Sequence, residues 1–251
     1  MIPKIIHYCW FGRNPKPEIV KKCIMSWRKL CPEYKLREWN EDNFDVTSCS
    51  YVKEAYENGK WAFVSDYVRL WVIYKEGGIY LDTDIELLKP LDKLLNYKAF
   101  FGYEDNYHLN TGIGFGAVKG NEMIYKILED YNRCHFVKED GTLDLTPCPE
   151  RNSKVFEKNN FQLTGKTEIQ NNIAFLSTEW LCPINYQTGE VNITSNTLSI
   201  HHYSGTWMSK EELKIIEIER RCKRYMGRKL AFWIRCRLYN IYQIGNKICK
   251  K

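Results

Sequence analysis

The 251-residue sequence lacks a long apolar run. Nowhere do the roughly 18 consecutive apolar residues occur that a membrane-spanning helix needs. The first residues, MIPKIIHYCWFG, also lack the cationic and then apolar segments of a secretory signal. We therefore expect a cytoplasmic protein without a spanning helix.

Paired cysteines are missing as well. The ten cysteines are widely spaced, with no CxxC pair and no Cys/His cluster of the kind that binds zinc. This spacing argues against a zinc site and predicts reduced thiols. Internal repeats and low-complexity tracts are absent too, so the length suits one large α/β domain with an appendage.

The net charge of +6 is unevenly distributed. Residues 209–251 hold 13 Lys/Arg and four Glu, whereas residues 1–208 hold 24 Lys/Arg and 27 Asp/Glu. The body is slightly acidic and the tail is strongly basic. We predict a folded domain over 1–208 and a basic amphipathic helical extension over 209–251.

Strand and helix patterns alternate over the first 130 residues. Strands are expected at about 2–10, 34–39, 79–85, 100–103 and 109–118, and helices at about 17–30, 51–58, 62–75 and 122–131. This alternation predicts a mostly parallel sheet with helices on both sides. Residues 135–200 read as an irregular insertion that ends in a strand, TLSIHHY.

The stretch GGIYLDTDIEL places two aspartates on what reads as a buried strand. Gly77 and Gly78 end the preceding helix. Residues i and i+2 of a strand share a face, so Asp82 and Asp84 would project together and repel each other. A hard divalent ion such as Mg²⁺ or Mn²⁺ relieves that repulsion. The alternative is a solvated strand end that carries both charges.

The preceding helix carries a second polar group in AFVSDYVR. Ser65, Asp66 and Arg69 lie on adjacent turns, directly before the aspartate pair. Asp66 and Arg69, at i and i+3, also have the spacing of a simple surface salt bridge.

These motifs together resemble a known family. The run AxxSDxxR followed by GGxYxDxD, with the opening IPKIIHYCWFG, is similar to glycosyltransferase family 32 and, more distantly, to the large clostridial glucosyltransferase toxins. The resemblance covers about residues 2–120. It implies a GT-A fold over 1–208, a Rossmann-like domain that binds a nucleotide sugar, and transfer with retention of anomeric configuration.

The resemblance also implies roles for residues of the first motifs. Trp10 would stack on the nucleobase, with Cys9 beside it, although a core tryptophan is the plain alternative. Asp66 and Arg69 would bind hydroxyls of the donor sugar, with Ser65 nearby. The DxD residues would act at the metal: Asp82 contacts the ribose or sugar and approaches the ion, and Asp84 ligates it.

Later elements complete the implied site. In SIHHYSGTW one of two adjacent histidines would face the metal, and we favour His202 over His201. Trp207 would contact the diphosphate. Asn110 would bind a sugar hydroxyl, unless it is only a turn residue. The sequence departs from the family where LTGK (163–166) replaces a frequent Thr-Gly-Pro.

The implied function is a metal-dependent retaining glycosyltransferase of bacterial surface polysaccharide synthesis (capsule, lipopolysaccharide or exopolysaccharide). We expect Mn²⁺ or Mg²⁺, a UDP-sugar rather than a GDP-sugar, a saccharide or lipid-linked saccharide acceptor, and no nucleic acid. Two alternatives are a sugar-binding or scaffold protein without turnover and a DxD phosphohydrolase. The hydrolase pattern needs Thr or Val where this chain has Glu86.

The basic tail reads as an interfacial helix. On a helical wheel, apolar residues form one stripe and arginines lie roughly opposite. The stripe comprises Leu230, Ile234, Leu238, Ile241, Ile244 and Ile248, and the arginines are Arg221, Arg224, Arg228 and Arg235. This pattern predicts peripheral binding to the anionic inner face of the cell membrane. A helix packed on the domain with a solvated basic face is the alternative.

Overall fold

The computed structural model describes residues 1–251 apart from 187, 206–209, 228–229, 232 and 239–251, and apart from several side chains between 210 and 224. The chain divides into two compact units. The first comprises Met1–Ile184 with Asn192–His202, and the second comprises Asn185–Val191 with Tyr203–Lys251. Every site residue that the structure describes belongs to the first unit.

A seven-stranded sheet forms the centre of the first unit, in the order β2-β1-β3-β6-β5-β8-β7. Five strands run in one direction, and β6 and β7 run against them. The predicted mostly parallel sheet is therefore confirmed. The strands are β1 (Ile5–Cys9), β2 (Lys35–Trp39), β3 (Gly78–Tyr80), β5 (Ala99–Gly102), β6 (Phe115–Ala117), β7 (Glu168–Gln170) and β8 (Ile173–Leu176). A separate antiparallel pair joins β4 (Ile85–Leu87) to β9 (Ser199–His201).

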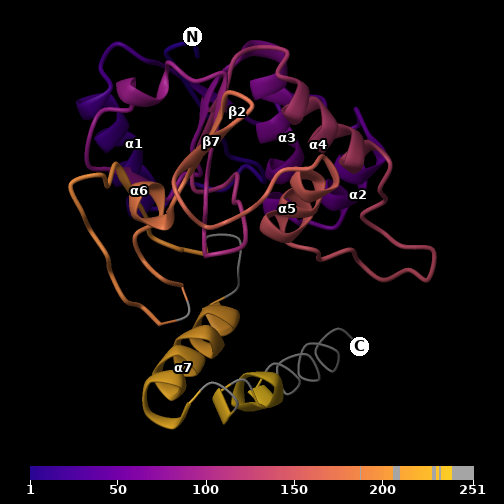
Figure 1. Ribbon diagram of the computed structural model, residues 1–251. Coiled ribbons are helices and arrows are strands. Elements are labelled where there is room, and N and C mark those ends of the chain that lie inside the picture. Colours follow the sequence, from indigo (N-terminus) through magenta and orange to yellow (C-terminus); the bar gives the residue numbers. More distant parts are fainter. Residues whose placement is uncertain (187, 206–209, 228–229, 232, 239–251) are drawn as a thin grey trace. The chain divides into compact units, whose positions relative to one another are not determined.

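Helices cover both faces of the sheet, as predicted. They are α1 (Glu18–Leu30), α2 (Ser50–Glu57), α3 (Trp61–Glu76), α4 (Glu122–Asn132), α5 (Cys148–Lys158) and α6 (Thr178–Leu181), with a 3₁₀ turn at Asp92–Leu94. Figure 1 shows α1 and α6 on one side and α2 to α5 on the other. The fold is thus the α/β type expected for a GT-A domain.

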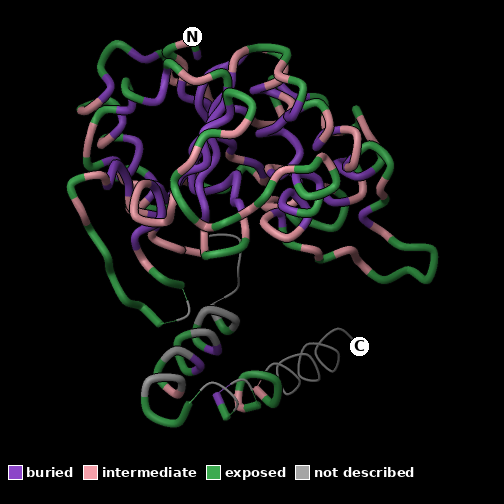
Figure 2. Tube along the Cα trace, in the orientation of Figure 1, coloured by how far each residue is buried: buried purple, intermediate pink, exposed green. Residues whose placement is uncertain are grey.

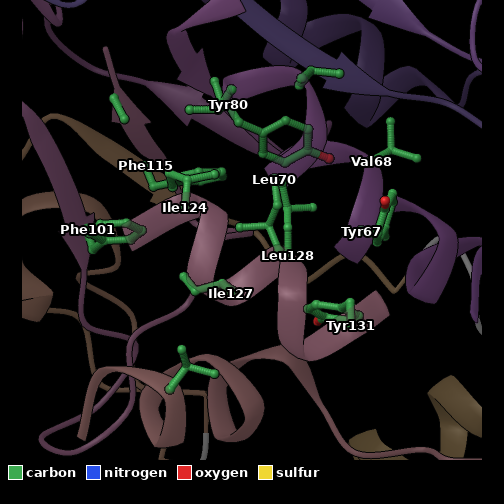
Figure 3. Packing of buried hydrophobic residues seen from close by; sticks show 14 of the residues in the cluster. Tyr67, Val68, Leu70, Tyr80, Phe101, Phe115, Ile124, Ile127, Leu128 and Tyr131 are labelled. Carbon is green, nitrogen blue, oxygen red and sulfur yellow. The ribbon is translucent and has the colours of Figure 1, made fainter. Parts of the chain in front are cut away.

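The core lies between α3, α4 and the sheet, where buried residues concentrate in Figure 2. Val68 and Leu70 of α3 and Ile124 and Leu128 of α4 are buried in one cluster. Figure 3 shows this packing. Half of the sixteen residues of α3 are buried, and the charged residues Asp66 and Arg69 are among them.

The aspartates do not lie on a strand, which corrects our prediction. Strand β3 ends at Tyr80, and the residues that follow form a turn in which the N–H of Ile85 donates to the C=O of Asp82 at 3.0 Å. The ladder to β6 ends at the Tyr80–Phe115 pair. Gly77 does cap α3, with φ 71° and its N–H bonded to the C=O of Ile73.

Residues 135–200 are more regular than we expected. They contain α5, β7, β8 and α6, and β8 joins the central sheet in parallel beside β5. The predicted irregular insertion is therefore wrong, although its final strand exists as β9.

The second unit contains α7 (Lys210–Met226), which ends before Gly227. Helix is described again at 230–231 and 233–238. Arg235 Nη1 lies 3.3 Å from Glu219 Oε2, and Ile215 and Ala231 are buried. Three residues of the predicted stripe, Ile241, Ile244 and Ile248, lie outside the described residues. In the described part of the chain, every helix is too short or too polar to cross a bilayer.

Candidate active site

Asp66 and Arg69 of α3 meet Asp82, the first aspartate of the DxD motif, in one ion cluster. Arg69 Nη2 lies 3.0 Å from Asp66 Oδ1 and 3.2 Å from Asp82 Oδ1. The same guanidinium donates through Nε to the C=O of Ser65 at 3.2 Å. Asp66 and Arg69 are buried, so the alternative of a surface salt bridge is wrong. A single cation joins the helix motif to the aspartate turn.

Burial shifts the acid–base behaviour of this cluster. Burial and the nearby charge of Asp82 raise the pKa of Asp66 to about 6, although Arg69 opposes that shift. The pKa of Asp82 is also raised, first by burial, and Arg69 again opposes it. Burial alone would lower the pKa of Arg69, but the carboxylates and Tyr80 outweigh it, so the guanidinium stays charged. The site thus holds two carboxylates around one permanent cation.

Two residues that the sequence did not single out fix Asp82. The Tyr80 hydroxyl donates to Asp82 Oδ1 at 2.9 Å. The N–H of Asp82 donates to the C=O of Gly112 at 3.1 Å. The Gly112 N–H in turn donates to Asn110 Oδ1 at 2.6 Å. Tyr80 could have been found from its position two residues before Asp82, and Gly112 from the glycine-rich run GIGFG.

Asp84 pairs with the first of the two adjacent histidines. His201 Nε2 lies 3.3 Å from Asp84 Oδ1, whereas His202 Nε2 lies 2.8 Å from Glu86 Oε2. Burial lowers the pKa of His201, but the Asp84 carboxylate outweighs it and raises that pKa well above its usual value. The side chain of His201, and not that of the favoured His202, therefore lies beside Asp84, and which histidine would face a metal stays a prediction.

Cys9 is the last residue of β1, and Trp10 follows it directly. Trp10 is half-buried, its indole N–H donates to the C=O of Asn14 at 2.7 Å, and Lys16 Nζ lies 5.9 Å from the ring centroid. Cys9 is buried, and burial raises the pKa of its thiol to about 12. Strands β1 and β3 are parallel neighbours, so Trp10 and Asp82 follow the same edge of the sheet, where α/β folds bind ligands.

Of the three remaining predicted residues, the structure describes Asn110 and Ser65. Asn110 is buried beside Gly112, and the Ser65 hydroxyl donates to the C=O of Trp61 at 3.1 Å. Trp207 lies outside the described residues. The binding roles of all these residues stay predictions.

The donor set suits a metal shared with a substrate. Among the described residues, no group of three or more His, Cys, Asp or Glu side chains is gathered as a closed metal site. Mg²⁺ and similar hard ions are commonly held by one or two carboxylates, with substrate phosphates supplying the other ligands. Asp84, with Asp82 two residues before it, fits that kind of open site.

Comparison with known proteins supports the same class. Residues 17–101, which carry Asp66, Arg69, Asp82 and Asp84, match the family model described as "Glycosyltransferase sugar-binding region containing DXD motif". The chain therefore contains a region similar to the DxD region of glycosyltransferases, which confirms the resemblance.

Curated relatives are fungal and viral. The chain is 30% identical over 139 residues to inositol phosphoceramide mannosyltransferase 3 of Schizosaccharomyces pombe, covering 54% of this chain and 38% of that protein. It is 31% identical over 148 residues to mannosyl phosphorylinositol ceramide synthase SUR1 of Saccharomyces cerevisiae, covering 55% and 37%. An uncharacterized glycosyltransferase, L373 of Acanthamoeba polyphaga mimivirus, is 25% identical and covered over 74% of both chains. The matches thus span less than half the length of these two fungal proteins.

Solved structures add a weaker likeness. The chain is similar to the PaToxG glycosyltransferase with a TM-score of 0.49 and 22% identity, covering 63% of this chain and 69% of that one. A glycosyltransferase involved in glycosylation of the major capsid of PBCV-1 has a TM-score of 0.48 and 15% identity, covering 82% and 95%.

Proposed function

We propose that this chain transfers a sugar from a nucleotide-sugar donor to a saccharide acceptor, with a divalent metal ion and with retention of configuration. One observation carries the proposal: Arg69 forms ion pairs with both Asp66 and Asp82. Asp82 precedes Asp84 by two residues, and it lies at the same edge of the sheet as Trp10. An ion cluster of this kind is costly to bury, and such groups concentrate at functional sites.

In this proposal each side chain has its own role. Asp66 accepts hydrogen bonds from hydroxyl groups on the sugar of the nucleotide-sugar donor. Arg69 already engages Asp66, Asp82 and the C=O of Ser65, so its main task is to hold the two carboxylates in place. Trp10 offers an apolar ring to the nucleobase, and Asn110 is available to a sugar hydroxyl through its amide nitrogen.

Asp84 and Asp82 would hold the metal, with His201 beside Asp84. When bound, such an ion neutralises the diphosphate leaving group. During transfer the bond between the anomeric carbon and the diphosphate oxygen breaks, and a bond to the acceptor oxygen forms. The acceptor proton passes to the departing phosphate oxygen, so no separate general base is assigned.

For the acceptor we propose a lipid-linked saccharide. Two of the relatives are named for transfer to inositol phosphoceramide, which is a lipid, and their names also specify mannose as the sugar. For the setting we propose bacterial surface polysaccharide synthesis at the inner face of the cell membrane. UDP-sugars remain our first choice of donor, and GDP-mannose is the competitor that those names suggest.

The test is a donor panel. The full-length protein is incubated with Mn²⁺ and with UDP- and GDP-sugars, and release of the nucleoside diphosphate is measured for wild type, Asp84→Ala and Asp140→Asn. Asp140 lies in an exposed turn, so Asp140→Asn is a matched loss of one carboxylate outside the site. We expect turnover that Asp84→Ala abolishes and Asp140→Asn retains. Donor binding without turnover would favour the binding-protein alternative, and Asp84→Ala at wild-type rate would refute the proposal.

A further inference from the structure

Apolar side chains are exposed around the break between the two helical segments of the second unit. Tyr225 is 81% exposed and Trp233 is 55% exposed, and Met226 and Leu230 are exposed between them. Gly227, with φ 77°, ends α7 at this point. Four large apolar residues within nine positions thus face solvent, which soluble domains usually avoid.

These four residues are not the packing face of their own unit. That face is formed by Ile215 and Ala231, which are buried, and by the pair between Glu219 and Arg235 at 3.3 Å. The exposed set therefore remains after the internal contacts of the unit have been made. We call Tyr225, Met226, Leu230 and Trp233 the apolar tip.

The sequence on both sides of the apolar tip is rich in positive charge. Between residues 214 and 237 the sequence has nine Lys/Arg and only two Glu. Both acidic side chains are already paired, Glu217 with Arg221 at 2.6 Å and Glu219 with Arg235. The Arg237 guanidinium lies 5.0 Å from the ring centroid of Trp233, so a cation sits directly at the aromatic part of the tip.

We propose that the apolar tip and its basic surroundings are a docking surface for an anionic lipid bilayer. Tryptophan and tyrosine prefer the boundary between headgroups and acyl chains, and Lys/Arg beside them bind anionic headgroups. Nucleic acid would match the charge, but its phosphate backbone would offer no apolar surface to Met226 and Leu230. An acidic protein partner would match the charge and the aromatic residues, but four apolar side chains are far fewer than the roughly 20–30 residues of a standard protein interface.

This surface differs from the stripe that the sequence suggested. Of that stripe, Leu230 belongs to the tip, whereas Ile234 and Leu238 are half-buried. Tyr225, Met226 and Trp233 were not in the stripe. The inference goes beyond the proposed function and does not depend on it, since it concerns binding to lipid and not transfer of sugar.

The experiment is co-sedimentation of the full chain with vesicles of phosphatidylcholine alone or mixed with phosphatidylglycerol. The double variant Tyr225→Ser with Trp233→Ser removes the aromatic part of the tip. Tyr107→Ser is the matched control, because Tyr107 is 71% exposed on the first unit. We expect binding to the anionic vesicles only, weakened by added salt, reduced about tenfold or more in the double variant and unchanged in the control.

Three outcomes would overturn the proposal. The first is a wild type that ignores anionic vesicles or a double variant that binds them equally well. The second is a wild-type dimer that the double variant converts to monomer, which would make the tip an interface between copies. The third is tighter binding to a random-sequence oligonucleotide than to the vesicles. Unchanged circular dichroism of the variants shows that loss of binding is not loss of folding.

Discussion

Asp82 lies directly against the backbone of Gly112. The N–H of Asp82 donates to the C=O of Gly112 at 3.1 Å, and the carboxylate Oδ2 occupies space that a Cβ at position 112 would need. The absence of a side chain on Gly112 therefore decides where this carboxylate sits. Asp82 is held from two sides, by Arg69 and by a residue thirty positions later in the chain.

Gly112→Ala should disable the site without unfolding the protein. The added methyl would overlap Asp82 Oδ2 and lie 3.0 Å from Arg69 Nη1 and Asn110 Oδ1, so the carboxylate must move. Displacements of about 1 Å in a positioned group can lower rates about 100-fold, and we expect a loss of kcat/KM of that order.

The control for this change is Gly120→Ala. Gly120 has φ 72° and open space around its Cβ position, so the substitution strains the backbone away from the site. It should lower the free energy of unfolding by about 1 kcal/mol and leave kcat/KM unchanged. A Gly112→Ala variant as active as wild type would contradict the role given to Asp82.

His201→Gln should lower the affinity for the metal more than His202→Gln does. His201 contacts Asp84, and loss of a partner that orients a metal ligand typically lowers affinity 10–100-fold, so we expect the Mn²⁺ concentration for half-maximal activity to rise about tenfold or more. His202 instead contacts Glu86, which Lys22 also binds at 3.2 Å. A Mn²⁺ titration of both variants is the measurement, and the reverse order of effects would restore His202 as the metal-facing histidine.

Cys148 should act as a positioning residue behind the donor site. Its thiol donates to Asn110 Oδ1 at 3.5 Å and accepts from Arg69 Nη1 at 3.7 Å. Cys148→Val leaves both groups without this partner, so we expect the donor KM to rise about tenfold. Cys148→Ser keeps a donor and an acceptor and should retain most of the affinity.

The matched control is Cys31→Val, a buried thiol outside the cluster. Both Val variants should have similar melting temperatures. If Cys31→Val raises the donor KM as much as Cys148→Val does, then the effect is general loss of packing and Cys148 has no specific role.

Local sequence signals predicted the parts of this site that are set locally. Helix α3, its glycine cap and the spacing of Asp66 and Arg69 follow from helical periodicity and from two glycines, so they were found. The turn at Asp82 was missed because the residues around it read as one alternating strand. What ends that strand is its partner β6, where the ladder stops at Phe115, and no local residue signals this.

Distant partners account for the other errors. Strand β8 has only four residues and becomes part of the sheet through β5, more than seventy residues earlier. Periodicity cannot distinguish so short an apolar run from a loop. The choice between His201 and His202 likewise depends on the register of β9 on β4, which is fixed by tertiary contacts.

His7 links the first strand to the end of α3 in a way that fixes its protonation. The indole N–H of Trp39 can only donate, and it lies 3.0 Å from His7 Nδ1, so that nitrogen is an acceptor. His7 Nε2 then carries the proton and donates to the C=O of Gly77 at 2.9 Å. Burial lowers the pKa of this imidazole from 6.5 to about 4, against the opposing effect of the bond to Gly77.

His7 should therefore make the fold weaker in mild acid. The unfolded chain binds a proton at His7 below about pH 6.5 while the folded chain does not until about pH 4, so stability is fully present above the higher value and falls as pH drops between the two. This contribution to the free energy of unfolding should decline by about 2 kcal/mol from pH 7 to pH 4.5. His7→Gln keeps an acceptor and a donor but cannot titrate, so its urea-unfolding free energy should decline less by that amount, and this difference is read from urea titrations of both proteins at several pH values. Equal slopes for wild type and His7→Gln would mean that His7 is charged in the folded protein.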